Sequence, residues 1–142
     1  MHVEIREGIR SVLIVEDEMI VALLMEDLIR DLGVSDVYLC VDAASALEIV
    51  RSKTIDCAVL DVRVRDGDTT QVADALAAQG TPFLFSSGGD AATLEPRHAG
   101  RPLISKPFHD DDLKLILLDT WFLARAERAP DAHIGARTAT AA

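Results

Sequence analysis

The sequence has little of several things that define large classes of protein. Only 4% of its 142 residues are aromatic, and only two are cysteines, Cys40 and Cys57. Both cysteines lie in apolar, strand-like stretches, which indicates buried thiols in a reducing compartment rather than a disulfide framework. The four histidines show no ligand spacing with the cysteines, which argues against a zinc site.

Basic residues and long apolar runs are also scarce. The 14 Lys and Arg residues face 24 Asp and Glu, which leaves a net charge of −10. Nucleic-acid binding needs a clustered basic face, so this balance argues against it. No apolar run approaches the ~18 residues that span a bilayer, and residues 1–10 contain no apolar core of a secretory signal. We therefore expect a cytoplasmic protein that binds neither nucleic acid nor membrane.

What the sequence does contain is enough apolar material for one folded domain. Apolar residues make up 49% of the chain, and a chain of this length fits one hydrophobic core. We expect the domain to span residues 11–127, after a short N-terminal extension at 1–10. Residues 128–142 are rich in Ala, Thr and Arg and are predicted to form a disordered tail with no output domain.

Short apolar runs alternate with helical patterns along this domain. The runs are continuously apolar, which predicts an α/β fold with helices on both faces of a parallel sheet. Helical periodicity and capping residues separate the runs, and the stretch around Pro96 is only weakly helical. The predicted strands are 11–15, 36–40, 57–61, 81–86 and 101–105, and the predicted helices are 19–32, 42–52, 71–79, a weak 91–100, and one from Asp110 to about 127.

The first predicted helix has one apolar side, and the last carries more apolar residues than one buried stripe needs. On the last helix, a stripe is predicted to pack inward while other leucines fall beside it, which suggests a partner or homodimer contact there. The first helix is expected to present Ile20, Leu23, Leu24, Leu28 and Leu32 on one side. The inward stripe of the last helix is Leu113, Ile116, Leu117, Trp121 and Phe122, with Leu115, Leu118 and Leu123 beside it.

Polar residues follow four of the predicted strands where each strand ends. Glu16 and Asp17 follow the first, Asp61 ends the third, Ser86 and Ser87 end the fourth, and Lys106 follows the fifth. The carboxyl ends of parallel strands lie at one edge of a sheet, so these side chains are predicted to converge. Three clustered carboxylates repel one another, and a divalent cation with oxygen ligands, best Mg²⁺, relieves that repulsion.

Such a cluster suits chemistry on phosphorus. With a cation bound, Asp61 stays ionised and can act as a nucleophile. The cation and Lys106 then neutralise charge on the oxygens of a transferring phosphoryl group, and the Ser87 hydroxyl can donate to another oxygen. Ser86 is the alternative hydroxyl for that role.

At these residues the sequence resembles the response-regulator receiver family. The matching stretches are 12–18, 59–62, Ser87-Gly88 and Lys106-Pro107-Phe108. The resemblance covers about residues 11–127 and implies a flavodoxin-like, doubly wound, five-stranded parallel sheet of order 2-1-3-4-5. About five helices would surround it, the fourth short. That order places the strands of Cys40 and Cys57 on either side of the first strand.

The resemblance also implies a role for each site residue. Asp61 matches the phosphoacceptor, Lys106 the phosphate-binding lysine and Ser87 the switch hydroxyl. The ligands of Mg²⁺ would be Glu16, Asp17, Asp61 and the backbone carbonyl of Arg63. Pro107 matches a position where the family has a cis peptide bond.

The run from Leu60 to Gly88 looks like the single-domain receivers of alphaproteobacteria, whose fourth strand ends Phe-Ala-Thr-Gly. The resemblance implies a non-enzymatic protein that takes a phosphoryl group from a sensor histidine kinase. It would signal by protein contact or through a histidine phosphotransfer protein. Two departures stand out: Ser86-Ser87 replaces Ala-Thr, and Leu103 replaces an aromatic that swings inward on activation in many receivers.

Two other functions use related residues. A haloacid-dehalogenase-like phosphatase also has an aspartyl nucleophile and Mg²⁺. Enzymes of that type resemble one another in carrying a second Asp, the general acid, two residues after the nucleophile. This chain has Arg63 at that position, which argues against this function. A pseudo-receiver would be a protein-binding scaffold without phosphorylation. The presence of Glu16, Asp17, Asp61 and Lys106 argues against it.

Overall fold

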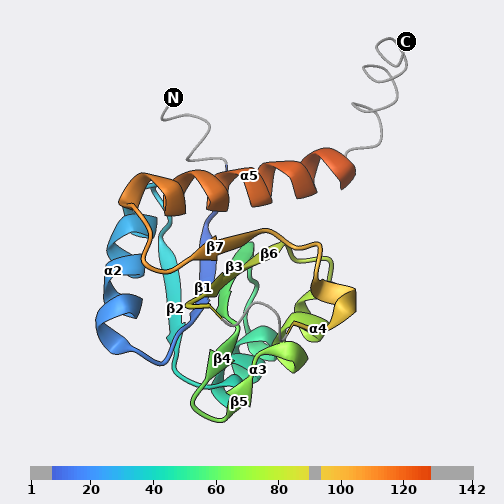
Figure 1. The fold of residues 1–142 in the computed structure, drawn as a ribbon. Helices are drawn as coiled ribbons and strands as arrows, with labels where there is room; N and C mark the ends of the chain where they lie inside the picture. Colours follow the sequence, from blue (N-terminus) through green and yellow to red (C-terminus); the bar gives the residue numbers. More distant parts are fainter. Residues whose placement is uncertain (1–7, 90–93, 129–142) are drawn as a thin grey trace.

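A computed structural model describes residues 8–89 and 94–128 of the chain. Five parallel strands form one sheet of order β2-β1-β3-β6-β7 (Figure 1). Numbering only these five strands along the chain, the order is 2-1-3-4-5, so the predicted flavodoxin-like sheet is confirmed. The strands are β1 (Ser11–Val15), β2 (Asp36–Cys40), β3 (Cys57–Asp61), β6 (Phe83–Ser87) and β7 (Leu103–Ser105).

Helices cover both faces of this sheet. In Figure 1, α5 lies across one side of the sheet, while α3 and α4 lie on the opposite side. In place of the weak helix predicted at 91–100, the described part holds only a single 3₁₀ turn; residues 91–93 lie outside the described residues. The helices are α2 (Met19–Arg30), α3 (Ala43–Ser52), α4 (Thr70–Ala78), the 3₁₀ turn η2 (Pro96–His98) and α5 (Asp110–Arg128).

The alternation of side chains along the strands divides the core into two clusters. Leu13, Leu60 and Phe85 belong to the cluster packed against α3 and α4. Ile14 and Val59, one residue away along their strands, belong to the cluster packed against α2 and α5. The three central strands β1, β3 and β6 therefore bury both of their faces, as their continuous apolar runs predict, whereas the edge strands β2 and β7 are only partly buried.

The two cysteines are free and buried, one in each cluster. Cys40 ends β2 and Cys57 begins β3, with β1 between their strands, as predicted. Burial raises the pKa of both thiols, that of Cys57 to about 12. The thiols are therefore protonated at neutral pH.

The predicted inward face of α2 is correct for Leu28, and Leu32 after the helix is partly buried, but it is wrong for Ile20, Leu23 and Leu24. The helix is apolar on nearly every side, so the periodicity alone does not select the buried side. Its buried residues are Ala22, Met25, Leu28 and Ile29, whereas Met19, Ile20, Leu23 and Leu24 are exposed. On α5, Leu113, Leu117 and Trp121 are buried as predicted, but Phe122 is 48% exposed together with Leu115 and Leu123.

The segment after β3, predicted as a loop, contains a small hairpin of β4 (Arg63–Val64) and β5 (Gly67–Asp68). Gly67 has a φ of 131°, which favours glycine at this turn. The Asp66 carboxylate accepts hydrogen bonds from the amides of Ala43 (2.8 Å) and Ala44 (3.2 Å) at the start of α3. The hairpin is therefore tied to a helix of the adjacent layer.

Residues 8–10 of the predicted N-terminal extension pack against the domain. Ile9 is buried, and the Arg10 amide donates to Asp56 Oδ2 at 2.8 Å. The predicted tail lies, from residue 129 on, outside the described residues. None of the helices in the described ranges is long and apolar enough to cross a membrane.

Candidate functional site

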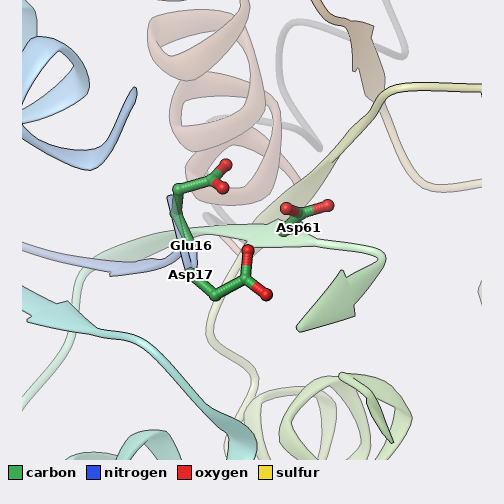
Figure 2. Close-up of side chains that lie close together, drawn as sticks. All are labelled: Glu16, Asp17 and Asp61. Atoms are coloured by element: carbon green, nitrogen blue, oxygen red, sulfur yellow. The ribbon is translucent and has the colours of Figure 1, made fainter. Parts of the chain in front are cut away.

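Three carboxylates meet at the carboxyl-terminal edge of the sheet. Glu16 and Asp17 directly follow β1, and Asp61 is the last residue of β3, the neighbour of β1 in the sheet. One carboxylate oxygen from each lies within 4.8 Å of the others (Figure 2). The convergence predicted from the strand ends is therefore present for all three acids.

Lys106 reaches this cluster from the end of β7, an edge strand that is separated from β3 by β6. It follows β7, and its Nζ lies 2.9 Å from Asp61 Oδ2 and 3.1 Å from Glu16 Oε1. The Lys106 side chain is only 17% exposed, and both of its partners are nearly or fully buried. The Lys106–Pro107 peptide bond is cis, as the family resemblance implies.

Burial makes the charges of this cluster costly. It is the largest cause that raises the pKa of Glu16, and the nearby Asp61 adds to it, while the Glu18 amide and Lys106 oppose it. Burial alone would lower the pKa of Lys106, but hydrogen bonds to Asp61 and Glu16 outweigh it and leave the pKa raised. Three carboxylates and one ammonium therefore leave a site that either protonates an acid or attracts a cation.

The donor set fits Mg²⁺. Every nearby ligand atom is a carboxylate oxygen, and hard divalent cations prefer oxygen. Two formal negative charges remain after Lys106 is counted, which a divalent ion would neutralise. Glu16, Asp17 and Asp61 would hold the ion. Arg63, whose carbonyl is predicted as a further ligand, lies two residues beyond Asp61 in β4, and its ligand role stays a prediction.

The two serines at the end of β6 differ in their surroundings. Ser87 is 2% exposed, and its Oγ accepts a hydrogen bond from the Gly89 amide at 3.1 Å. Ser86 is fully buried, and its hydroxyl has no hydrogen-bond partner among the described residues. Successive residues of a strand point to opposite faces, so the two hydroxyls lie on opposite sides of the sheet.

Sequence reasoning missed Thr69, which holds the loop beside the cluster. Its buried hydroxyl donates to the Asp61 backbone carbonyl at 2.7 Å, and its amide donates to the Val62 carbonyl at 3.2 Å. These bonds fix the backbone on which Asp61 is carried. The position of Thr69 after a turn is visible in the sequence, but the contact depends on how the turn closes.

A second missed group anchors the segment between β6 and β7. Asp74 of α4 accepts from Arg97 Nε and Nη2, both at 2.9 Å, and lies 2.7 Å from His98 Nε2. The His98 ring is buried against Phe83 and Phe85. Asp74, Arg97 and His98 thus join η2 to α4; we call them the η2 anchor.

This combination of sheet and site has a known counterpart. The chain belongs to the response regulator receiver domain family, whose model matches residues 12–118. Among solved structures, it is 37% identical to SdrG from Sphingomonas melonis Fr1, with a TM-score of 0.71 over 80% of this chain and 97% of SdrG. None of the curated proteins compared with the chain matches it.

Two more structures share the fold. The receiver domain of PhyR from Erythrobacter litoralis is 25% identical, with a TM-score of 0.72 over 82% of this chain and 93% of that domain. The receiver domain of the sensor histidine kinase PA1611 from Pseudomonas aeruginosa PAO1 is 23% identical, with a TM-score of 0.67 over 79% and 97% of the two chains. That domain holds a magnesium ion in its active site cleft.

Proposed function

We propose that the chain is a single-domain response regulator that accepts a phosphoryl group on Asp61 in a Mg²⁺-dependent reaction. The donor is a phosphohistidine of a sensor histidine kinase. The observation that carries the proposal is the position of Asp61 at the end of β3, within 4.8 Å of two other acids and 2.9 Å from Lys106 Nζ.

The residues at the site have different roles in phosphoryl transfer. An Asp61 carboxylate oxygen attacks phosphorus, the bond from phosphorus to the histidine nitrogen breaks, and its electron pair stays on the imidazole, which then takes up a proton. Lys106 keeps its proton and moves with the phosphoryl oxygens, where its charge offsets theirs. Bound Mg²⁺ would supply further neutralisation of the same oxygens. The acceptor consumes one phosphoryl group per cycle, so we propose that the protein is a phosphoacceptor and not an enzyme.

The exposed apolar side of α2 supports docking of a partner beside Asp61. Met19, Ile20, Leu23 and Leu24 are each at least 43% exposed. A mostly apolar groove continues from this side of α2 to Lys106 and Phe108. A histidine carried on a partner helix could pack on this surface while its ring faces Asp61. The kinase, and a histidine phosphotransfer protein in a relay, are the partners this surface would take.

The other parts of the proposal concern output. No DNA or RNA contact is expected from the acidic composition, and output would be by protein contact or relay in the cytoplasm. The exposed Leu115, Phe122 and Leu123 of α5 favour a protein contact, such as a homodimer through this helix.

The experiment is phosphorylation by acetyl phosphate with Mg²⁺, followed by intact mass. The parent should gain one phosphoryl group, and Asp61→Asn should gain none. Asp119→Asn removes an exposed carboxylate of α5 far from the sheet edge and should behave as the parent. An undiminished adduct in Asp61→Asn would contradict the proposal, and so would an adduct that forms equally well with chelator in place of Mg²⁺.

A further inference from the structure

Ser86 is a buried polar residue whose hydroxyl is left unpaired by the part of the chain that the structure describes. The residue is 0% exposed, and Oγ has no hydrogen-bond partner among the described residues. Buried hydroxyls in native proteins nearly always have a partner, because an unsatisfied one costs free energy. An alanine would fill the same position without that cost, so the hydroxyl calls for an explanation other than packing.

The strand register places Ser86 beside the phosphoacceptor. Ser86 pairs with Asp61 on β3 and with Ile104 on β7. Paired residues of parallel strands point to the same face, and neighbouring strands lie ~4.8 Å apart. Two residues earlier on the same two strands, Leu84 and Val59 share the core cluster of α2 and α5. The side chains of Ser86 and Asp61 are therefore lateral neighbours on that face.

The Lys106 side chain crosses the same place. Lys106 follows β7, yet its ammonium reaches Asp61 on β3, and β6 lies between these two strands. The side chain therefore passes over the end of β6, where Ser86 lies. Its ammonium donates hydrogen bonds to Asp61 Oδ2 and Glu16 Oε1. In this state these two carboxylate oxygens are already engaged by a charged donor, which binds them more strongly than a hydroxyl would.

We propose that the Ser86 hydroxyl donates a hydrogen bond to the Asp61 carboxyl group after phosphorylation, and that this bond speeds loss of the phosphoryl group. The inference rests on the proposed function. Phosphoryl oxygens draw the Lys106 ammonium away from the carboxyl group, which leaves a carboxyl oxygen without its donor. Rotation about χ1 moves a serine hydroxyl among three staggered positions, so Ser86 can turn to that oxygen without a backbone change.

The hydrogen bond acts on the leaving group of hydrolysis. A water oxygen attacks phosphorus, and the bond from phosphorus to the Asp61 oxygen breaks. The electron pair stays on the carboxylate, and the water proton leaves with the inorganic phosphate or passes to solvent. Negative charge grows on the carboxylate as the bond breaks, so a hydrogen bond to it is stronger in the transition state than before. One such bond accounts for roughly a threefold to tenfold change in rate.

The test is the lifetime of the phosphorylated protein. The parent, Ser86→Ala and Ser86→Cys are phosphorylated with acetyl phosphate and Mg²⁺, desalted, and followed by intact mass. We expect Ser86→Ala to decay roughly threefold to tenfold more slowly, and Ser86→Cys to be intermediate, because a thiol is a weak donor. Thr120→Val, which removes a buried hydroxyl of α5 that bonds within its own helix, should decay at the parent rate.

The outcomes separate this role from a structural one. The melting temperature of Ser86→Ala should equal or exceed that of the parent, since the substitution removes an unpaired hydroxyl. A parent-like decay rate in a folded Ser86→Ala overturns the inference while leaving the proposed function intact. If Ser86→Ala fails to fold, parent-like decay of Ser86→Cys overturns it. A parent that takes no phosphoryl group on Asp61 overturns both proposals.

Discussion

The two halves of the sheet edge are held in different ways. At β1 and β3, Glu16 and Asp61 are buried and bonded to Lys106, Asp17 beside them is partly buried, and Thr69 holds the Asp61 backbone. At β6 and β7, the described residues between the two strands, 88–89 and 94–102, hold one 3₁₀ turn as their regular structure. The η2 anchor, with an Asp74 side chain 43% exposed, fastens that segment to α4.

This difference suggests a division of labour. A phosphoacceptor needs its ligands held in a fixed geometry, which buried strand ends supply. A responding segment needs two states close in free energy, which a segment with few buried contacts supplies. We therefore expect substitutions in the first half to remove chemistry, and substitutions in the second half to alter the response while the chemistry persists.

The largest effect in the first half is expected for Asp17→Asn. The substitution removes one carboxylate charge and one of three clustered oxygen ligands. The Kd for Mg²⁺, measured by calorimetry, should rise at least about tenfold. Asp36→Asn, an exposed acid at the start of β2 on the opposite edge, should keep the parent Kd. Equal Mg²⁺ affinity in Asp17→Asn and the parent would refute the metal site.

Lys106→Ala should separate phosphoryl chemistry from metal binding. Without the ammonium, phosphorylation of Asp61 should slow by roughly tenfold or more, because the charge that offsets the phosphoryl oxygens is gone. Mg²⁺ should bind at least as tightly, since the removed cation repels it. Calorimetry measures the affinity for Mg²⁺, and the rate of adduct formation measures phosphorylation. Lys53→Ala is the control for removing an exposed lysine. A collapse of Mg²⁺ affinity with normal phosphorylation would reverse the assigned role.

In the second half, activation should show in hydrogen exchange. With Leu103 in the place of an aromatic, no ring can swing inward, so the response is expected in the backbone around Ser87 and η2. A new charge-assisted hydrogen bond to Ser87 is worth roughly 1.5–3 kcal/mol. Amide exchange with beryllofluoride and Mg²⁺ should change most at residues 86–89 and 94–102, and Ser87→Ala should reduce that change. Changes confined to α2 and the segment 62–69 would point to another route.

The smallest effect is expected for Asp74→Asn in the η2 anchor. The Arg97 hydrogen bonds, and then His98, hold the pKa of Asp74 below its usual value. A carboxyl group with a lowered pKa stabilises the fold above its ordinary pKa and loses that stabilisation as the pH falls. Because Asp74 is partly exposed, we expect a loss of only about 1 kcal/mol at neutral pH. Urea unfolding measures it, with Asp119→Asn as control, and phosphorylation should be unchanged. Loss of phosphorylation would show that the two halves are not separate.

The first half was largely predictable from sequence. Its strands are unbroken apolar runs, and Glu16, Asp17 and Asp61 stand where those runs end. Parallel strands bring such ends together whatever the details of the loops. The acids were therefore predicted to converge, and they do.

The second half was much less predictable. The η2 anchor joins Asp74 to residues more than 20 positions later, and no periodicity links them. In the first half, the buried side of α2 was predicted incorrectly for Ile20, Leu23 and Leu24, because the first two turns of this helix are apolar on every side and only a neighbour decides which side is covered. Whether a hydroxyl such as that of Ser86 finds a partner likewise depends on side-chain positions rather than on residue type.

The buried thiols have a practical consequence for spectroscopy. Cys40 and Cys57 are 6% and 0% exposed, and their raised pKa values keep them from forming the thiolate that attacks maleimides and iodoacetamides. A cysteine introduced on the surface, for example Ala99→Cys directly after η2 or Glu48→Cys on α3, should thus react with a dye while the native thiols stay unreacted. A protein that carries both labels would report the expected movement of η2 relative to α3, with the two native cysteines left in place.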